Sequence, residues 1–222
     1  MEILNSKFKN KISKDWLSEF PDFKRYKPML LIRRNGPILC GFELRSTSSK
    51  TYYEPTFFIH SLMIEDAPAM SMGSVFIPLT DKGAKDYVRI CFHEKDFSNV
   101  SQKMKESVPL LQKSTPSLYE IIEFIKKQER HKWYSSYEFE IIILLLFWYG
   151  KVDEAEKELE NALSIISKWD DSTGLIRFLG VKGWENEMRD LMNNDILQEN
   201  INKEIVKFKL EEFIDYRLID DK

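Results

Sequence analysis

The chain has 222 residues, of which 43% are hydrophobic and 31% are charged, and its formal net charge at pH 7 is -3. This is the balance of an ordinary soluble globular protein of one or two domains, and so small an acidic excess implies no general affinity for nucleic acid or membranes. Residues 1–50 hold eleven Lys and Arg against five Asp and Glu, or +6, so the remainder carries -9.

The N-terminal segment and the two cysteines predict the compartment. MEILNSKFKNKISKDWLSEF is rich in Lys and amphipathic, and it has neither the apolar core nor the cleavage site of a signal peptide. Cys40 and Cys91 have apolar neighbours, and two cysteines do not make a disulfide framework. We therefore expect buried, reduced thiols, a cytoplasmic protein, and a leading helix that ends at Pro21.

The residues after Pro21 predict an antiparallel sheet. Two apolar runs flank Asn35-Gly36, and Asn-Gly between such runs favours a tight hairpin because both residues tolerate a positive φ. Three more segments are rich in aromatic and β-branched residues, namely YYEPTFFIHSLMI, GSVFIPLT and KDYVRICFHE. Five strands are thus expected within residues 28–94.

The polar segment 95–114, KDFSNVSQKMKESVPLLQKS, has no clear period. We place the join between two halves there. Residues 1–110 are then a helix plus a mostly antiparallel β-sheet, and residues 111–222 are helical. The expected fold class is α+β.

Three successive helices are expected over residues 115–169. The first begins at Thr115 and Pro116, which are typical N-cap and first-turn residues. The second contains the nine apolar residues Ile141–Tyr149, which are too few for a membrane span of about 20. A helix that is apolar all round must be covered on several sides. The first helix and the third, which follows Gly150, are expected to cover it.

Residues 136–169 resemble a single tetratricopeptide-type helical hairpin. The matching positions are Tyr149, Gly150, Ala155, Leu159 and Ala162. The resemblance implies two closely packed helices. No second copy follows at the family's period of about 34 residues, and repeat units need neighbours, so we do not expect a peptide-binding solenoid.

Beyond residue 170 the pattern loosens. Short helices broken by turns are expected first, and Trp184 and Met188 fit one helical face. The stretch from Val206, VKFKLEEF, alternates apolar and charged residues. A helix and a strand both remain open there.

The motifs of several enzyme classes do not occur. The chain has no glycine-rich phosphate loop, no HExxH, no CxxC and no G-x-S-x-G. We therefore expect neither a cofactor nor a metal. Acid–base hydrolysis of RNA would need His60, His93 and a lysine such as Lys95 around one cleft. A thiolate mechanism would need Cys91 beside His93, although strand positions i and i+2 are about 7 Å apart.

A metal-dependent nuclease, or another phosphodiester hydrolase, is the alternative function. PDFK at 21–24 and FELR at 42–45 resemble the PD-(D/E)xK endonuclease pattern through Asp22, Glu43 and Arg45. The resemblance implies two carboxylates that hold a metal, which polarises water. The sequence departs from the pattern because Asp22 follows a helix in a loop and Arg45 replaces a tunable Lys.

The basic N-terminal stretch interleaves Lys and Arg with aromatic residues. Nucleic-acid binding would need those aromatic rings to be accessible. We expect instead a solvated helix face whose aromatic residues belong to the core, and hence no nucleic-acid partner.

An acidic helix is the predicted binding surface. Residues 151–171 hold seven Asp and Glu against three Lys, or -4. Asp153, Glu154 and Glu158 are expected on its outer, polar face, where they would dock a basic protein partner. The sequence therefore predicts a non-catalytic protein–protein interaction module, such as an inhibitor, immunity or adaptor protein.

Overall fold

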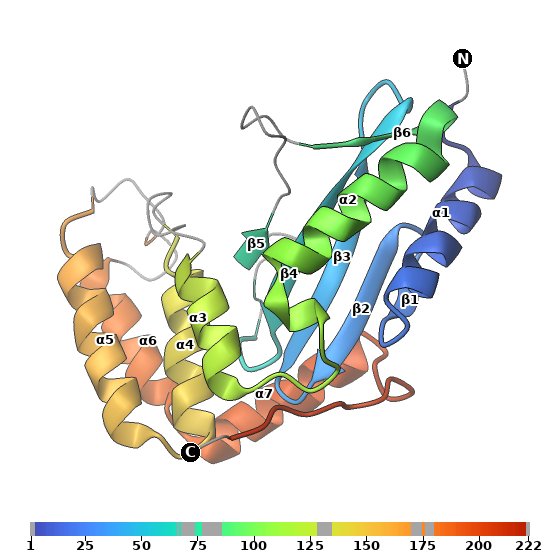
Figure 1. The fold of residues 1–222 in the computed structure, drawn as a ribbon. Helices are drawn as coiled ribbons and strands as arrows, with labels where there is room; N and C mark the ends of the chain where they lie inside the picture. The colour runs from blue at the N-terminus through green and yellow to red at the C-terminus, as the bar shows by residue number, and fades with distance from the viewer. Residues whose placement is uncertain are drawn as a thin grey trace. The chain divides into compact units, whose positions relative to one another are not determined.

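A computed structural model describes residues 3–65, 67, 74–76, 86–127, 135–169, 175 and 180–220. The chain forms two compact units. Unit 1 comprises Met1–His60, Pro68–Pro116 and Phe213–Arg217, and unit 2 comprises Ser61–Ala67, Ser117–Glu212 and Leu218–Lys222. An antiparallel sheet with a leading helix precedes a helical C-terminal half, so the predicted α+β class is confirmed (Figure 1).

Helix α1 (Ser6–Glu19) opens unit 1. The side-chain oxygen of Asn5 caps it by accepting a hydrogen bond from the backbone N–H of Phe8 at 3.0 Å. Trp16 on its inner face is fully buried, and its ring lies 5.1 Å from the ring of Phe42 between centroids. The predicted leading helix is thus confirmed, and one face of it belongs to the core.

The sheet of unit 1 has the strand order β1-β2-β3-β4-β5, and β6 also pairs with β4. Its strands are β1 (Lys24–Lys27), β2 (Leu30–Asn35), β3 (Ile38–Ser46), β4 (Tyr52–Ser61), β5 (Ser74–Phe76) and β6 (Val88–Arg89). The pairs β1–β2, β2–β3, β4–β5 and β4–β6 are antiparallel. Strand β1 was not predicted, because its sequence KRYK has no apolar alternation.

The predicted hairpin forms one residue later than expected. Asn35 pairs with Ile38, so the two turn residues are Gly36 and Pro37. Gly36 has φ of 61°, which only glycine adopts without a steric cost. Asn35 is instead the last residue of β2, and its side chain is fully buried.

Helix α2 (His93–Ser107) occupies most of the segment in which the sequence placed the join between the two halves. Its buried apolar residues, Val100 and Met104, form a stripe too narrow to give a clear period. In place of the longer strand expected before α2, the structure has the two-residue strand β6 and a 3₁₀ turn at Ile90–Phe92. Cys91 lies in that turn and is exposed, which corrects the expectation that it is buried.

Aromatic rings pack between the two helices and the sheet, and Figure 1 shows α2 in front of the strands and α1 beside them. The buried rings are those of Trp16, Phe20, Phe23, Phe42 and Phe57. Phe20 and Phe42 lie 4.7 Å apart between ring centroids. The rings of Trp16, Phe20 and Phe23 are therefore core residues, as predicted, and offer no accessible surface on which bases could stack.

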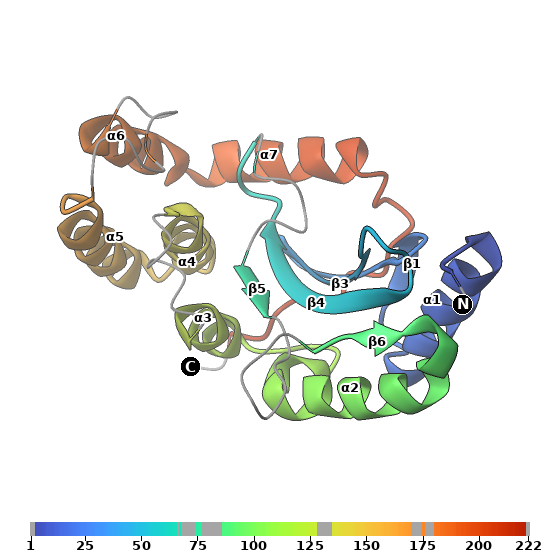
Figure 2. The same ribbon diagram turned by 90° about the horizontal axis from the view of Figure 1, so that it is seen from above.

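Unit 2 is helical. Its helices are α3 (Leu118–Lys127), α4 (Tyr137–Trp148), α5 (Val152–Ile166), α6 (Val181–Leu191) and α7 (Asn194–Lys207). Every residue from Tyr137 to Leu146 is buried, and α4 packs against both α3 and α5 (Figure 2). The buried central helix is thus confirmed, although Phe147, Trp148 and Tyr149 are only half-buried. No helix in the described part of the chain is long and apolar enough to cross a membrane.

The ends of the helices in unit 2 have specific caps. The N–H of Glu120 donates to the Ser117 hydroxyl at 3.2 Å, and the Ser117 N–H donates to the Glu120 carboxylate at 2.8 Å. This capping box places the start of α3 at Ser117 instead of Thr115. Gly150, with φ of 74°, follows α4 as predicted.

The stretch from Val206 begins at the end of a helix and continues in turns. Helix α7 ends at Lys207, and the next residues form turns. Leu197 and Ile201 are buried on α7, as the helical pattern predicts. The charged residues of the alternating stretch are exposed, Lys207 at the end of α7 and the others in the turns, so the alternation reflects no strand.

Candidate functional site

The two carboxylates that resemble an endonuclease pattern each lie beside an arginine. Arg45 donates to the carboxylate of Glu43 at 2.7 Å, and both lie on β3. Asp22 follows α1 in a turn, and its carboxylate lies 4.0 Å from the guanidinium of the buried Arg33. Among the residues that the structure describes, no group of three or more His, Cys, Asp or Glu could hold a metal ion.

The two histidines considered for acid–base chemistry occupy different elements. His60 lies on β4 and is fully buried. His93 is the first residue of α2 and is also buried, whereas Lys95 and Cys91 near it are exposed. A solvent-accessible pair of histidines is therefore not formed.

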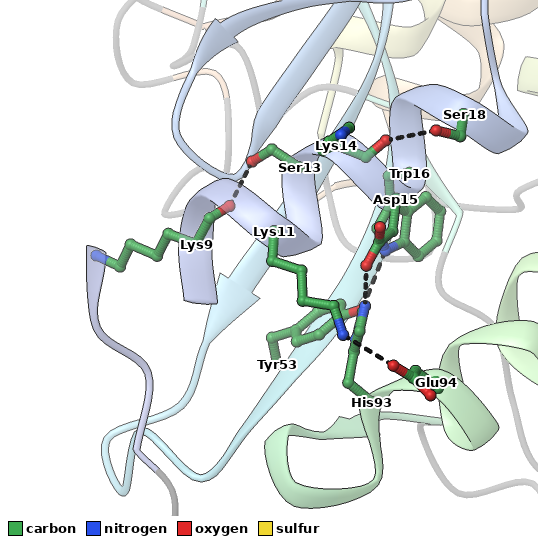
Figure 3. Close-up of polar contacts among 10 residues, drawn as sticks. All are labelled: Lys9, Lys11, Ser13, Lys14, Asp15, Trp16, Ser18, Tyr53, His93 and Glu94. Atoms are coloured by element: carbon green, nitrogen blue, oxygen red, sulfur yellow. Dashed lines mark hydrogen bonds and ion pairs between the residues drawn. The ribbon is translucent and has the colours of Figure 1, made fainter. Parts of the chain in front are cut away.

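His93 instead belongs to a buried chain of polar groups within unit 1 (Figure 3). The indole N–H of Trp16 donates to the Tyr53 hydroxyl at 3.0 Å, and that oxygen lies 3.3 Å from Nδ1 of His93. Nε2 of His93 lies 3.0 Å from the carboxylate of Asp15. Since an indole N–H can only donate, the hydroxyl donates to Nδ1, and the Nε2–H of a neutral imidazole donates to Asp15.

These hydrogen-bonded groups have the form of a carboxylate–imidazole–hydroxyl relay. The hydroxyl, that of Tyr53, is however not accessible to a substrate. Tyr53 is fully buried, and burial raises the pKa of its hydroxyl, so it stays protonated. Burial also lowers the pKa of His93, and the hydrogen bond to Asp15 opposes this effect. We infer that these hydrogen bonds hold α1, β4 and α2 together. Local sequence patterns could not predict them, because the three elements are far apart in the sequence.

Stability should depend on the protonation of His93. Its folded pKa is below its ordinary value of 6.5, so the folded state binds fewer protons than the unfolded chain at mildly acidic pH. Asp15, Tyr53, Lys11 and Glu94 are the titratable or charged groups that act on it. We therefore expect the free energy of unfolding to fall as the pH is lowered through about 6.5.

Urea unfolding at several pH values between about 8 and about 5 tests this expectation. The variant His93→Gln serves as the reference. The difference in unfolding free energy between the wild type and the variant should shrink towards acidic pH. A difference that stays constant, or grows, would show that protonation of His93 is not penalised in the folded state.

The two thiols should react very differently. Cys40 is buried, and burial raises its pKa, although the nearby Arg33 opposes this effect. Cys91 is exposed. A thiol reagent should therefore modify Cys91 rapidly and Cys40 only after unfolding. Mass spectrometry of native protein should show one added group, and none in Cys91→Ser; rapid addition to that variant would contradict the burial of Cys40.

The acidic residues predicted on the outside of α5 have different environments. Asp153 is exposed. Glu154 is half-buried and accepts hydrogen bonds from the Tyr119 hydroxyl at 3.0 and 3.1 Å. Glu158 is buried, and its carboxylate lies 2.6 Å from Nζ of Lys126 on α3. The outward placement of Glu158 was therefore wrong, because the cation on α3 draws its carboxylate into the helix contact.

A groove lies between α3, α4 and α5. Its lining residues are Ile125, Lys126, Glu138, Phe139, Ile142, Glu158, Asn161 and Ile165. The apolar members are contributed by all three helices, and both acidic members are buried. This α3–α4–α5 groove has a composition that suits a side chain with an apolar stem and a cationic head.

In comparisons with known proteins, no family model, no curated protein and no solved structure matches the chain. A function is therefore inferred from the chemistry of the described residues.

Proposed function

We propose that the chain is a non-catalytic protein-interaction module of the cytoplasm, of the inhibitor, immunity or adaptor type, which binds a basic protein partner. The composition of the α3–α4–α5 groove carries this proposal. Its apolar lining suits the methylene stem of a Lys or Arg side chain, and Glu138 and Glu158 supply carboxylates for the charged head.

Lys126 of the chain itself already pairs with Glu158 and would compete with a cation from the partner. Its ammonium lies 2.6 Å from Glu158, but its side chain is 49% exposed, so it can turn outward at little cost. A cation from the partner would then replace it beside Glu158. Asp153 and Glu160 are exposed on the same helix, and their charge would accelerate association with a basic partner.

If Lys126 competes with the partner, variants of Glu158 and Lys126 should change the affinity for a basic peptide in opposite directions. The probe is a fluorescein-labelled peptide of alternating Lys and Leu, titrated by anisotropy at low salt. Glu158→Gln keeps the shape of the side chain and should weaken binding about two- to fivefold, the effect of one partly exposed ion pair. Lys126→Gln removes the competitor and should strengthen binding by a similar factor.

Lys127→Gln is the matched control for the loss of a positive charge. Lys127 is the next residue of α3, is well exposed, and lies 3.8 Å from Glu123 outside the groove. It should change the affinity much less than Lys126→Gln. Equal effects of the two lysine variants, or no effect of Glu158→Gln in a folded variant, would contradict binding in the groove.

A further inference from the structure

The two carboxylate oxygens of Glu158, in the α3–α4–α5 groove, have different partners. Oε2 lies 2.6 Å from Nζ of Lys126, and Oε1 accepts a hydrogen bond from the side-chain amide of Asn161 at 3.3 Å. The side chain of Glu158 is only 11% exposed. A cation that enters the groove therefore meets a carboxylate of which one oxygen is already engaged from within α5.

The position of Asn161 follows from its spacing. It lies three residues after Glu158 on α5, so the two side chains are neighbours on the helix surface, about one turn apart. A carboxylate can only accept hydrogen bonds, so the NH₂ group of the amide faces Oε1. Because this donor is neutral, it engages one oxygen without cancelling the negative charge of Glu158.

Lysine and arginine require different arrangements of a carboxylate. The ammonium of Lys is a compact point charge, and one oxygen is enough to bind it. The guanidinium of Arg has a delocalised charge and pairs most strongly through two parallel N–H···O bonds, which use both oxygens. The contact of Lys126 with Glu158 is of the first kind, because Asn161 engages the second oxygen.

We propose that the α3–α4–α5 groove selects lysine over arginine in its basic partner, and that Asn161 determines this selection. The inference rests on the proposed function, which it narrows from basic side chains to lysine. A lysine of the partner takes the place of Lys126 at Oε2 and leaves the Asn161 hydrogen bond intact. An arginine either breaks that hydrogen bond or binds through Oε2 alone, and each alternative loses a favourable contact.

The test compares two fluorescein-labelled peptides of equal length, one of alternating Lys and Leu and one of alternating Arg and Leu. Each is titrated with the full chain by anisotropy at low salt. The wild type should bind the Lys peptide about threefold more tightly, which is the size of one neutral hydrogen bond. Asn161→Ala makes Oε1 available to a guanidinium, so the ratio of the two affinities should fall to about one or below.

Asn202→Ala is the matched control. It makes the same chemical change at an exposed position of α7, where the Asn202 side chain accepts a hydrogen bond from Gln198 outside the groove. The ratio of affinities should stay at the wild-type value. Lys126→Gln removes the competitor of both peptides, so it should strengthen both alike and leave the ratio unchanged. A mere loss of stability would weaken both peptides together, which the ratio does not record.

Glu158→Gln separates the failure of this inference from the failure of the proposed function. If this variant weakens both peptides, equal binding of the two peptides by the wild type would overturn the selection of lysine alone. So would a ratio that Asn161→Ala leaves unchanged in a protein that circular dichroism shows to be folded. If neither peptide binds, or if Glu158→Gln changes neither affinity, the proposed function and the selection of lysine are both overturned.

Discussion

Replacing Leu145 with Asp should lower the free energy of unfolding by about 4 kcal/mol. Leu145 is fully inaccessible, and it lies in the stretch of α4 that is buried at every residue from Tyr137 to Leu146. The substitution removes a large apolar side chain and places a carboxylate at a position that solvent does not reach. Neutralising that carboxylate by protonation would itself cost free energy.

Thermal unfolding followed by circular dichroism measures this effect. In a chain of this length 1 kcal/mol corresponds to about 2–4 °C, so the transition that reports unit 2 should fall by about 10 °C. Leu145→Met conserves volume and should cost less than about 1.5 kcal/mol. A Leu145→Asp protein that melts within about a degree of the wild type would show that α4 is not the buried centre of the unit.

Replacing Arg33 with Met should lower the free energy of unfolding by about 3 kcal/mol. Arg33 lies on β2 and is 1% exposed. Its guanidinium donates to the side chain of Asn35 at 2.9 Å and to the backbone carbonyls of Leu110 and Lys113 at 3.0 Å each. Met fills a similar volume but leaves these three acceptors, two of them buried, without their donor.

Arg45→Met is the control, because the chemical change is the same on an exposed side chain. Arg45 pairs with Glu43 at 2.7 Å, and its side chain is 54% exposed, so the loss should be about 0–1 kcal/mol. Urea unfolding of both variants gives the comparison. Equal losses would mean that the Arg33 hydrogen bonds do not fasten the segment around Leu110 to the sheet.

Much of the fold was predictable because its signals are local. The leading helix, the hairpin near Gly36 and the buried helix over Ile141–Leu146 follow from caps, turn residues and hydrophobic period. Helix α2 was missed because only a narrow stripe, including Val100 and Met104, is buried on it. Its place is set by packing against the rest of unit 1, which periodicity does not record.

The environments of the charged residues were the least predictable part. Glu158 looks like a solvated residue in its own helix, but its carboxylate pairs with Lys126, 32 positions earlier. Asp15 and His93 are 78 positions apart. A sequence pattern shows which charges a helix carries, whereas their partners depend on which elements the fold brings together. The acidic helix was thus recognised, and the groove beside it was not.

The most direct test of a basic partner at the α3–α4–α5 groove is quantitative capture from an extract of the source cell. Wild type, Glu158→Gln, Lys126→Gln and Lys127→Gln serve as baits, and mass spectrometry measures each captured protein. We expect at least one basic protein that is enriched on Lys126→Gln, depleted on Glu158→Gln and unchanged on Lys127→Gln, relative to wild type. Capture of the same proteins in the same amounts on all four baits would contradict it.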